Sequence, residues 1–121
     1  MVTWFEIPVT DMNRAKAFYE KVFDIEIHLV EMDGVKMGWF PNKNQVGTAT
    51  GTLILLEEDY KPSADGVVVY FSSEDVANEI ARVNVSGGKV LIDKKMISKE
   101  NGFFAQFIDS EGNRIALHSQ K

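Results

Sequence analysis

The sequence predicts an α+β fold made of two βαβββ modules that close into a curved, mixed-sheet cup. The first observation is an internal repeat, in which an apolar strand pattern runs into a polar cluster and a helix pattern at residues 4–19 and again at residues 68–77. Asp11 and Asp75, which open the two helix patterns, are 64 positions apart in a chain of 121 residues. A period near half the chain length is most simply explained by two copies of one supersecondary unit. The second observation is that three strand patterns follow each helix pattern.

The first strand is expected at residues 2–9, where apolar and other side chains alternate. Successive side chains of a strand point to opposite faces of its sheet. The apolar odd-numbered side chains should therefore pack against a helix. Glu6 and Trp4 belong to the even-numbered side and should lie on the other face, which must tolerate a carboxylate.

The rest of the first module, expected to span residues 1–58, follows from caps and turns. Asp11 is a favourable N-cap, and apolar residues at helical spacing after it predict a helix over residues 11–23. Asp33-Gly34 is a strong hairpin signal between the next two strands. The three strands are predicted at residues 25–32, 35–40 and 51–57. Their large apolar residues are expected in the core, namely Met32, Met37, Trp39 and Phe40.

Residues 59–65 are expected to link the modules because they are polar and contain Pro62. The second module should then span residues 66–121 and repeat the same order of elements. Gly87-Gly88 is expected to end its helix. The predicted elements are a strand at 67–72, a helix at 74–86, and strands at 89–97, 103–109 and 114–119, with Met96 in the core.

Composition excludes several classes of function. The 13 Lys and Arg residues are outnumbered by 18 Asp and Glu residues, giving a formal net charge of −5, which argues against nucleic-acid binding. Cysteine is absent, so disulfides and thiolate chemistry are excluded. No basic leader and no apolar run near 18 residues is present, so we expect no membrane partner and a cytoplasmic location.

The inward face of the cup is where a ligand is expected, and Glu6 is the most informative residue on it. A carboxylate withdrawn from water needs a partner or a raised pKa, and such groups concentrate at functional sites. The alternative is a Glu6 paired with Arg or Lys near the rim. Tyr70 occupies the equivalent position of the second module, where its hydroxyl could bind a ligand carbonyl or it could simply form an aromatic wall.

Further candidates share the inferred inward parity on the later strands. His118 could act as base, acid or ligand, or be an exposed residue near the C-terminus. Arg114 could bind an anionic substrate or neutralise Glu6. Trp4 is expected to form pocket wall. Ser72 and Gln106 complete the candidates of this parity.

Three segments together resemble a known family. Residues 4–19, 87–90 and 109–115, in this order and spacing, resemble the vicinal oxygen chelate superfamily, which includes glyoxalase I, bleomycin-resistance proteins and extradiol dioxygenases. The resemblance covers essentially the whole chain. It implies a cup built from paired modules and, commonly, a homodimer.

The resemblance also implies where a metal would bind. Metal-dependent members hold a divalent metal with a His near the start of each module's first strand and a carboxylate on each last strand. These positions fall here on Trp4, Val68 and Ala116, and the strand at 51–56 offers no ligand before Glu57. Trp, Val and Ala cannot supply the lone pairs that such metals require.

Three functional hypotheses follow. The first is a glyoxalase/bleomycin-resistance-like protein that binds a small organic molecule without a metal or other cofactor, in an apolar cup lined by Trp4, Val68 and Ala116, with Glu6, Tyr70 and His118 giving polar recognition. The second is a divergent metal-dependent lyase or dioxygenase, with Glu6 and His118 as catalytic residues and relocated ligands of a divalent metal. The third is a non-catalytic dimeric interaction module whose cup is filled by side chains.

Overall fold

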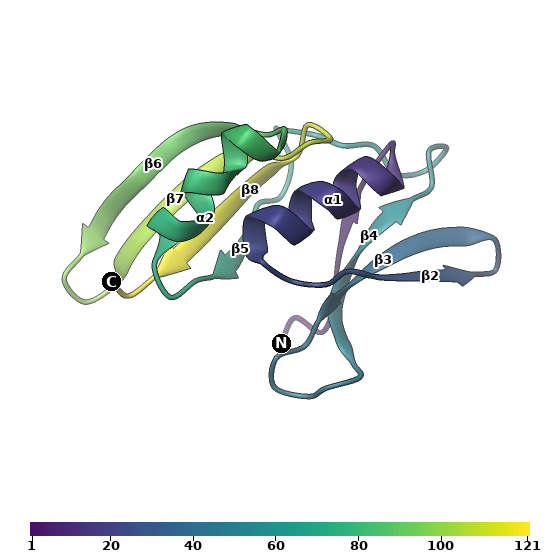
Figure 1. The fold of residues 1–121 in the computed structure, drawn as a ribbon, viewed down its shortest axis with the longest axis horizontal. Helices are drawn as coiled ribbons and strands as arrows, with labels where there is room; N and C mark the ends of the chain where they lie inside the picture. The colour runs from purple at the N-terminus through teal and green to yellow at the C-terminus, as the bar shows by residue number, and fades with distance from the viewer. The chain divides into compact units, whose positions relative to one another are not determined.

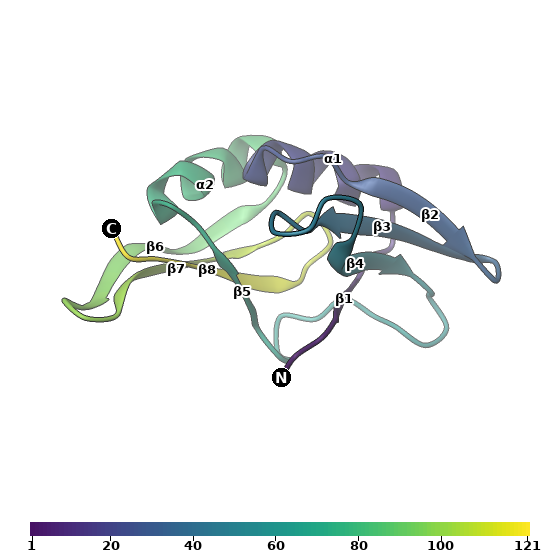
Figure 2. The ribbon, with the colours of Figure 1, turned by 90° about the horizontal axis from the view of Figure 1, so that it is seen from below.

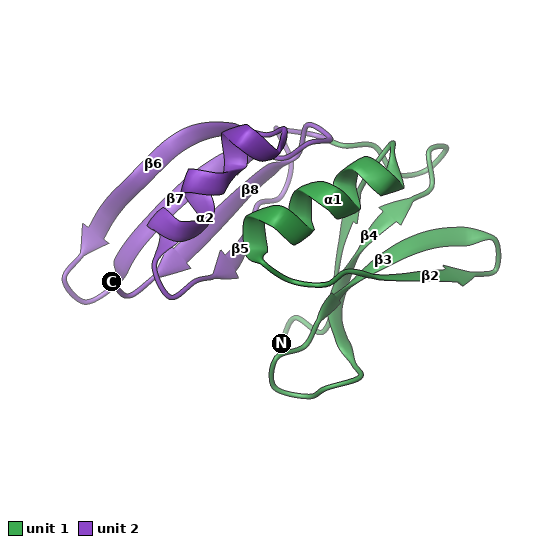
Figure 3. Cartoon of the chain, viewed as in Figure 1, with its two compact units in different colours: residues 1–62 green, residues 63–121 purple.

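The structure, a computed structural model, describes residues 1–121 and divides into two compact units, residues 1–62 and residues 63–121 (Figure 3). The boundaries predicted at 58 and 66 bracket this division. Ser63 is tied into the second unit by two backbone groups: its N–H donates to Asn113 Oδ1 over 3.1 Å, and its carbonyl accepts from the Arg114 N–H over 3.3 Å.

Unit 1 is one βαβββ module (Figure 1). Its four strands form one sheet in the order β1-β4-β3-β2, with β1 parallel to β4 and the other neighbours antiparallel. The elements are β1 (Phe5–Pro8), α1 (Met12–Phe23), β2 (His28–Met32), β3 (Val35–Pro41) and β4 (Ala49–Leu55).

Unit 2 repeats the module, with strand order β5-β8-β7-β6 and β5 parallel to β8. The elements are β5 (Val69–Ser72), α2 (Val76–Val83), a 3₁₀ turn η1 (Asn84–Ser86), β6 (Lys89–Ser98), β7 (Gly102–Ile108) and β8 (Arg114–Ser119). The predicted α+β class with two βαβββ modules is confirmed.

The repeat extends to the register of the strands. In unit 1, residues 5–8 pair with residues 51–54. In unit 2, residues 69–72 pair with residues 115–118. Adding 64 to every residue of the first pairing gives the second, so the interval that separates Asp11 from Asp75 also relates the central strand pairs.

Each helix covers one face of its own sheet (Figure 2). Each helix begins after an N-cap aspartate, because the Asp11 side chain accepts from the Arg14 N–H and the Asp75 side chain accepts from the Ala77 N–H, each over 3.0 Å. Many of the helix-facing side chains of the strands are buried. In unit 1 they include Ile7, Leu53 and Phe40, and the Phe40 ring packs on Tyr19 of α1 with ring centroids 5.3 Å apart. Neither helix is long and apolar enough to cross a membrane.

Several predicted boundaries were wrong. The second helix was expected at 74–86 but begins at Val76, because its N-cap Asp75 has an extended backbone, and its last turn is the 3₁₀ turn η1. Gly87 then ends it with a φ of +106°. The first strand of each module is shorter than predicted because parallel pairing begins only at Phe5 and Val69.

Two methionines expected in the core are exposed instead. Met32 is 49% exposed and Met96 is 55% exposed. Each lies on an edge strand of its sheet, β2 or β6, where strand neighbours cover one side only. Edge position, which the hydrophobic pattern alone does not reveal, explains the error.

The pairing of β1 with β4 gives a stability prediction. A Cβ built on Gly51 would overlap the Phe5 ring, which packs on Phe40 with ring centroids 5.3 Å apart. We expect Gly51→Ala to lower the free energy of unfolding by about 1–3 kcal/mol, because overpacking displaces that ring. Gly66→Ala is the matched control, since no atom lies within 4 Å of its added Cβ. Denaturant titration measures both, and equal effects of the two changes would contradict the prediction.

Candidate functional site

A row of side chains crosses the unit 1 sheet on the face opposite α1. The register places Glu6 beside Thr52, Thr52 beside Trp39, and Trp39 beside His28. The alternating neighbours face the other way: a Cβ on Gly38 would meet Met12 of α1. The parity inferred from the sequence for Glu6 therefore matches its placement away from the helix.

Glu6 has two hydrogen-bonding partners, both neutral. The indole N–H of Trp4 donates to Glu6 Oε2 over 3.4 Å. The Tyr60 hydroxyl donates to the same carboxylate, and this hydrogen bond, together with repulsion by the charge of Glu6, raises the pKa of Tyr60. Glu6 is exposed, so it is not withdrawn from water as expected, and no Lys or Arg of unit 1 forms an ion pair with it.

Two tryptophan rings stand beside this carboxylate. The Trp4 and Trp39 ring centroids are 6.1 Å apart, and the ring planes meet at 84°. Trp4 is 38% exposed. The Trp39 Nε1 atom is buried and has no hydrogen-bond partner, which costs free energy on the order of 1–3 kcal/mol. Thr52 offers no free hydroxyl, because it lies 2.6 Å from the Leu53 carbonyl and 3.1 Å from the Gly38 carbonyl and is fully buried.

The corresponding row in unit 2 carries different chemistry. The register aligns Tyr70, Ala116 and Gln106 across β5, β8 and β7. The Gln106 side-chain amide donates to the Tyr70 hydroxyl, and an Arg114 guanidinium N–H donates to Gln106 Oε1, both over 3.5 Å. The three polar groups thus form one chain, and the Arg114 Nε atom is buried without a partner.

The other unit 2 candidates lie at the ends of this face. His118 is half-buried beside Ser72 in the register, and its Nε2 atom lies 2.7 Å from the Asn101 carbonyl oxygen. His118 is therefore held to the turn that joins β6 to β7, and is not a free C-terminal residue. Val68 is half-buried and immediately precedes β5.

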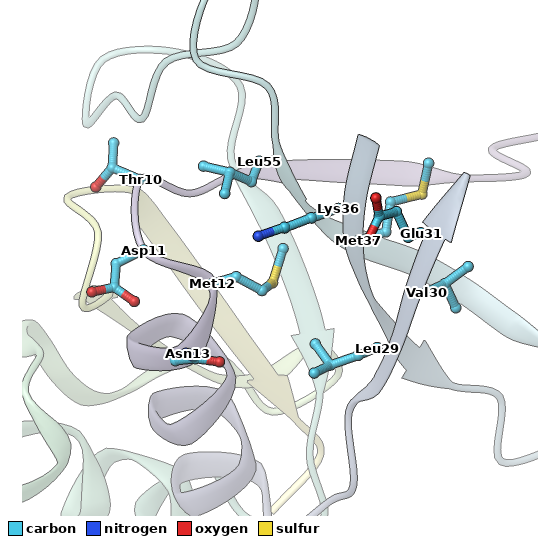
Figure 4. Close-up of a pocket in the computed structure, with 10 residues that line it drawn as sticks. All are labelled: Thr10, Asp11, Met12, Asn13, Leu29, Val30, Glu31, Lys36, Met37 and Leu55. Carbon is cyan, nitrogen blue, oxygen red and sulfur yellow. The ribbon is translucent and has the colours of Figure 1, made fainter. Parts of the chain in front are cut away.

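A cavity lies on the opposite, helix-bearing side of the unit 1 sheet (Figure 4). It has a volume of about 570 Å³ and separates the start of α1 from β2, β3 and β4. Its apolar lining includes Met12, Leu29 and Leu55, and Figure 4 shows the Lys36 side chain extending into it from β3. None of the residues predicted as site residues lines this cavity.

Comparison with known proteins identifies the family. The sequence model of the Glyoxalase/Bleomycin resistance protein/Dioxygenase superfamily matches residues 2–117. The chain belongs to this superfamily. A glyoxylase-like domain-containing protein of Didymella fabae is 29% identical over 119 residues, which cover 96% of this chain and 91% of that protein.

Solved structures of the superfamily share the fold. Glyoxalase I from Zea mays superposes with a TM-score of 0.70 at 18% identity over 98% of this chain, which spans 45% of the maize chain. A glyoxalase-related enzyme from Fulvimarina pelagi superposes with a TM-score of 0.68 at 15% identity, covering 98% of this chain and 87% of that one. At these identities the likeness establishes the fold alone.

The residues at the superfamily's metal positions do not fit a metal. The Trp4 indole is a donor and already binds Glu6, and Val68 and Ala116 have no donor atoms. By the repeat, the counterpart of Ala116 in unit 1 is Thr52, whose hydroxyl is taken up by backbone carbonyls. Within neither unit do three His, Asp or Glu side chains gather into a group that could hold a metal ion.

Sequence reasoning missed two residues of the Glu6 cluster. Trp39 was assigned to the core, although the alternation along β3 places it opposite Gly38 and hence away from the helix. A Cβ at position 38 would lie 2.8 Å from Ile27 and 3.3 Å from Met12 of α1, so Gly38 faces the helix and the neighbouring Trp39 faces the Glu6 side. Tyr60 lies in the predicted linker, and no periodic pattern there connects it with Glu6.

The contact between Tyr60 and Glu6 predicts a measurable titration. We expect Glu6→Gln to lower the pKa of Tyr60 toward its ordinary value of about 10, because the hydrogen bond to the carboxylate and the charge that repels the phenolate are both removed. Tyrosine carbon NMR resonances followed against pH measure this, with Tyr60→Phe assigning the signal. Glu26→Gln, at an exposed position before β2, should leave the titration unchanged. An unaltered Tyr60 titration in Glu6→Gln would contradict the contact.

Proposed function

We propose that this chain binds a small organic molecule on the face of the β1–β4 sheet opposite α1, with Glu6, Trp4, Trp39 and Tyr60 as its recognition residues. The observation that carries the proposal is the composition of this cluster. An exposed carboxylate has only neutral partners from Trp4 and Tyr60, and stands next to two tryptophan rings set nearly at right angles.

This composition suits ligand recognition better than it suits folding. Ligand sites combine apolar and aromatic walls with a few polar groups that fix orientation. Tryptophan supplies a large apolar surface together with one N–H donor. Trp4 precedes β1 and remains partly exposed, so its ring adds little to the core that α1 and the sheet form.

The unit 2 candidates also stay proposed ligand contacts, on the face of their own sheet. Tyr70, Gln106 and Arg114 form a polar chain, and Ala116 lies between Tyr70 and Gln106 in the register. The remaining predicted contacts are Val68, Ser72 and His118. The hydrogen bond from His118 to the Asn101 carbonyl favours a positioning role over acid or base catalysis for this residue.

We propose that binding requires no metal or other cofactor. The donor atoms at the superfamily's metal positions support this, because Trp4, Val68, Thr52 and Ala116 supply no free ligand for one. The alternative, a divalent metal held by Glu6 and His118, would have fewer protein ligands than the three that catalytic zinc usually keeps.

Metal content tests this directly. After incubation with nickel, zinc, manganese and ferrous iron and then desalting, we expect elemental mass spectrometry to find well below one metal per chain, because no three-ligand group is present. Near-stoichiometric metal that disappears in Glu6→Gln but persists in Glu26→Gln would contradict the proposal and favour a metal-dependent lyase or dioxygenase.

Homodimerisation, which the family resemblance implies, is also proposed. Sedimentation velocity should then give twice the 13.6 kDa mass of one chain. A monomer at all concentrations would count against it. The cytoplasmic location expected from the sequence stays a prediction.

A ligand screen tests the function itself. Both tryptophans of the chain lie in the proposed site, so a bound molecule should alter their fluorescence and raise the melting temperature. For a compound that does so, we expect Trp4→Leu to weaken binding roughly threefold to tenfold, since one aromatic wall is lost. Leu29→Ala, which changes the helix-side cavity, is the control and should have no effect. A broad panel that changes neither signal would contradict the proposal.

A further inference from the structure

We infer that the ligand of the Glu6 cluster is an organic cation, such as an amine or a quaternary ammonium compound. This inference rests on the proposed function and names the chemical class of its ligand. It starts from the charge of Glu6. Its carboxylate is exposed to solvent, and the Trp4 indole N–H donates to its Oε2 atom over 3.4 Å. No Lys or Arg of unit 1 pairs with this negative charge.

The two hydrogen-bonding partners of Glu6 are neutral and do not compensate its negative charge. Trp4 and Tyr60 donate neutral hydrogen bonds, and an ionised carboxylate can accept about four. Acceptor positions therefore remain for a ligand. A charged donor would form the stronger hydrogen bond, because charge-assisted hydrogen bonds are roughly twice as strong as neutral ones.

The rings beside Glu6 favour the same kind of ligand. Trp4 and Trp39 meet at 84° with centroids 6.1 Å apart, which gives two aromatic surfaces at a corner next to the carboxylate. A cation within about 6 Å of a tryptophan centroid is attracted by the negative face of the ring, and tryptophan is the best aromatic residue for this. An anionic ligand would meet repulsion from Glu6 and from both ring faces.

The charge of unit 1 acts in the same direction. Residues 1–62 contain six Lys and Arg residues and ten Asp and Glu residues, for a net charge of −4, whereas residues 63–121 contain seven and eight, for −1. Most of the −5 of the chain is therefore on the unit that carries the cluster. His28 is the last residue of the same row. It lies on β2, which is separated from β1 by β4 and β3.

The experiment compares a cation with its neutral isostere. Choline and 3,3-dimethylbutan-1-ol have nearly the same shape but differ by one positive charge, and benzyltrimethylammonium adds an aromatic body. Binding is followed by tryptophan fluorescence and calorimetry at low salt. We expect choline to bind roughly tenfold more tightly than the alcohol. Added salt should reduce the difference.

Two variants show whether the preference for a cation comes from Glu6 itself or from the net charge of unit 1. Glu6→Gln and Glu26→Gln remove the same charge from the same unit, but only Glu6 lies in the cluster. We expect Glu6→Gln to abolish the preference for the cation and Glu26→Gln to keep it. Trp4→Leu, which leaves the carboxylate in place, should weaken binding of both cations several-fold.

The outcomes distinguish this inference from the proposed function. Neutral compounds that bind the cluster as tightly as the cations would overturn the inference and leave the function standing. Equal losses in Glu6→Gln and Glu26→Gln would also overturn it, because the preference would then come from net charge alone. If no compound, charged or neutral, changes the fluorescence, both the inference and the proposed function fail.

Discussion

The structure of this chain depends on one constraint: each module has a single helix, and a sheet has two faces. The helix and the strands bury their apolar side chains against each other, as Ile7, Leu53 and Phe18 do in unit 1. The side chains of the other face then have no helix to pack against. That face can carry residues that a core would not tolerate, and in unit 1 it carries Glu6.

The 64-residue repeat gives the two modules the same backbone frame with different side chains. The pairing of the first strand with the last is the same in both, displaced by 64 residues, but the side chains on the face opposite the helix differ. Glu6 and Thr52 in unit 1 correspond to Tyr70 and Ala116 in unit 2. The backbone is thus shared, while the chemistry of each face belongs to its own unit. In this superfamily member, neither face offers the ligand set of a metal site.

Much of this could be predicted from the sequence, because it depends on local rules. Alternation along β1 placed Glu6 opposite the helix, Asp11 and Asp75 marked the helix starts, and the interval between them revealed the two modules. What could not be predicted depends on contacts between distant segments. Tyr60 reaches Glu6 from 54 residues away in the chain, and Trp39 reaches Trp4 across the sheet. Edge exposure of Met32 and Met96 likewise follows from strand order, which hydrophobic periodicity does not encode.

We propose that ligand binds the Glu6 face and not the helix-side cavity of unit 1. Heteronuclear NMR of the chain with a bound ligand tests this most directly, because the two indole N–H groups give separate signals. The Trp4 N–H donates to Glu6 and the Trp39 N–H is buried without a partner. We expect both indole signals to shift as ligand is added, together with the backbone signals of β1. Unchanged indole signals, with shifts confined to Met12, Leu29 and Lys36 around the cavity, would contradict it.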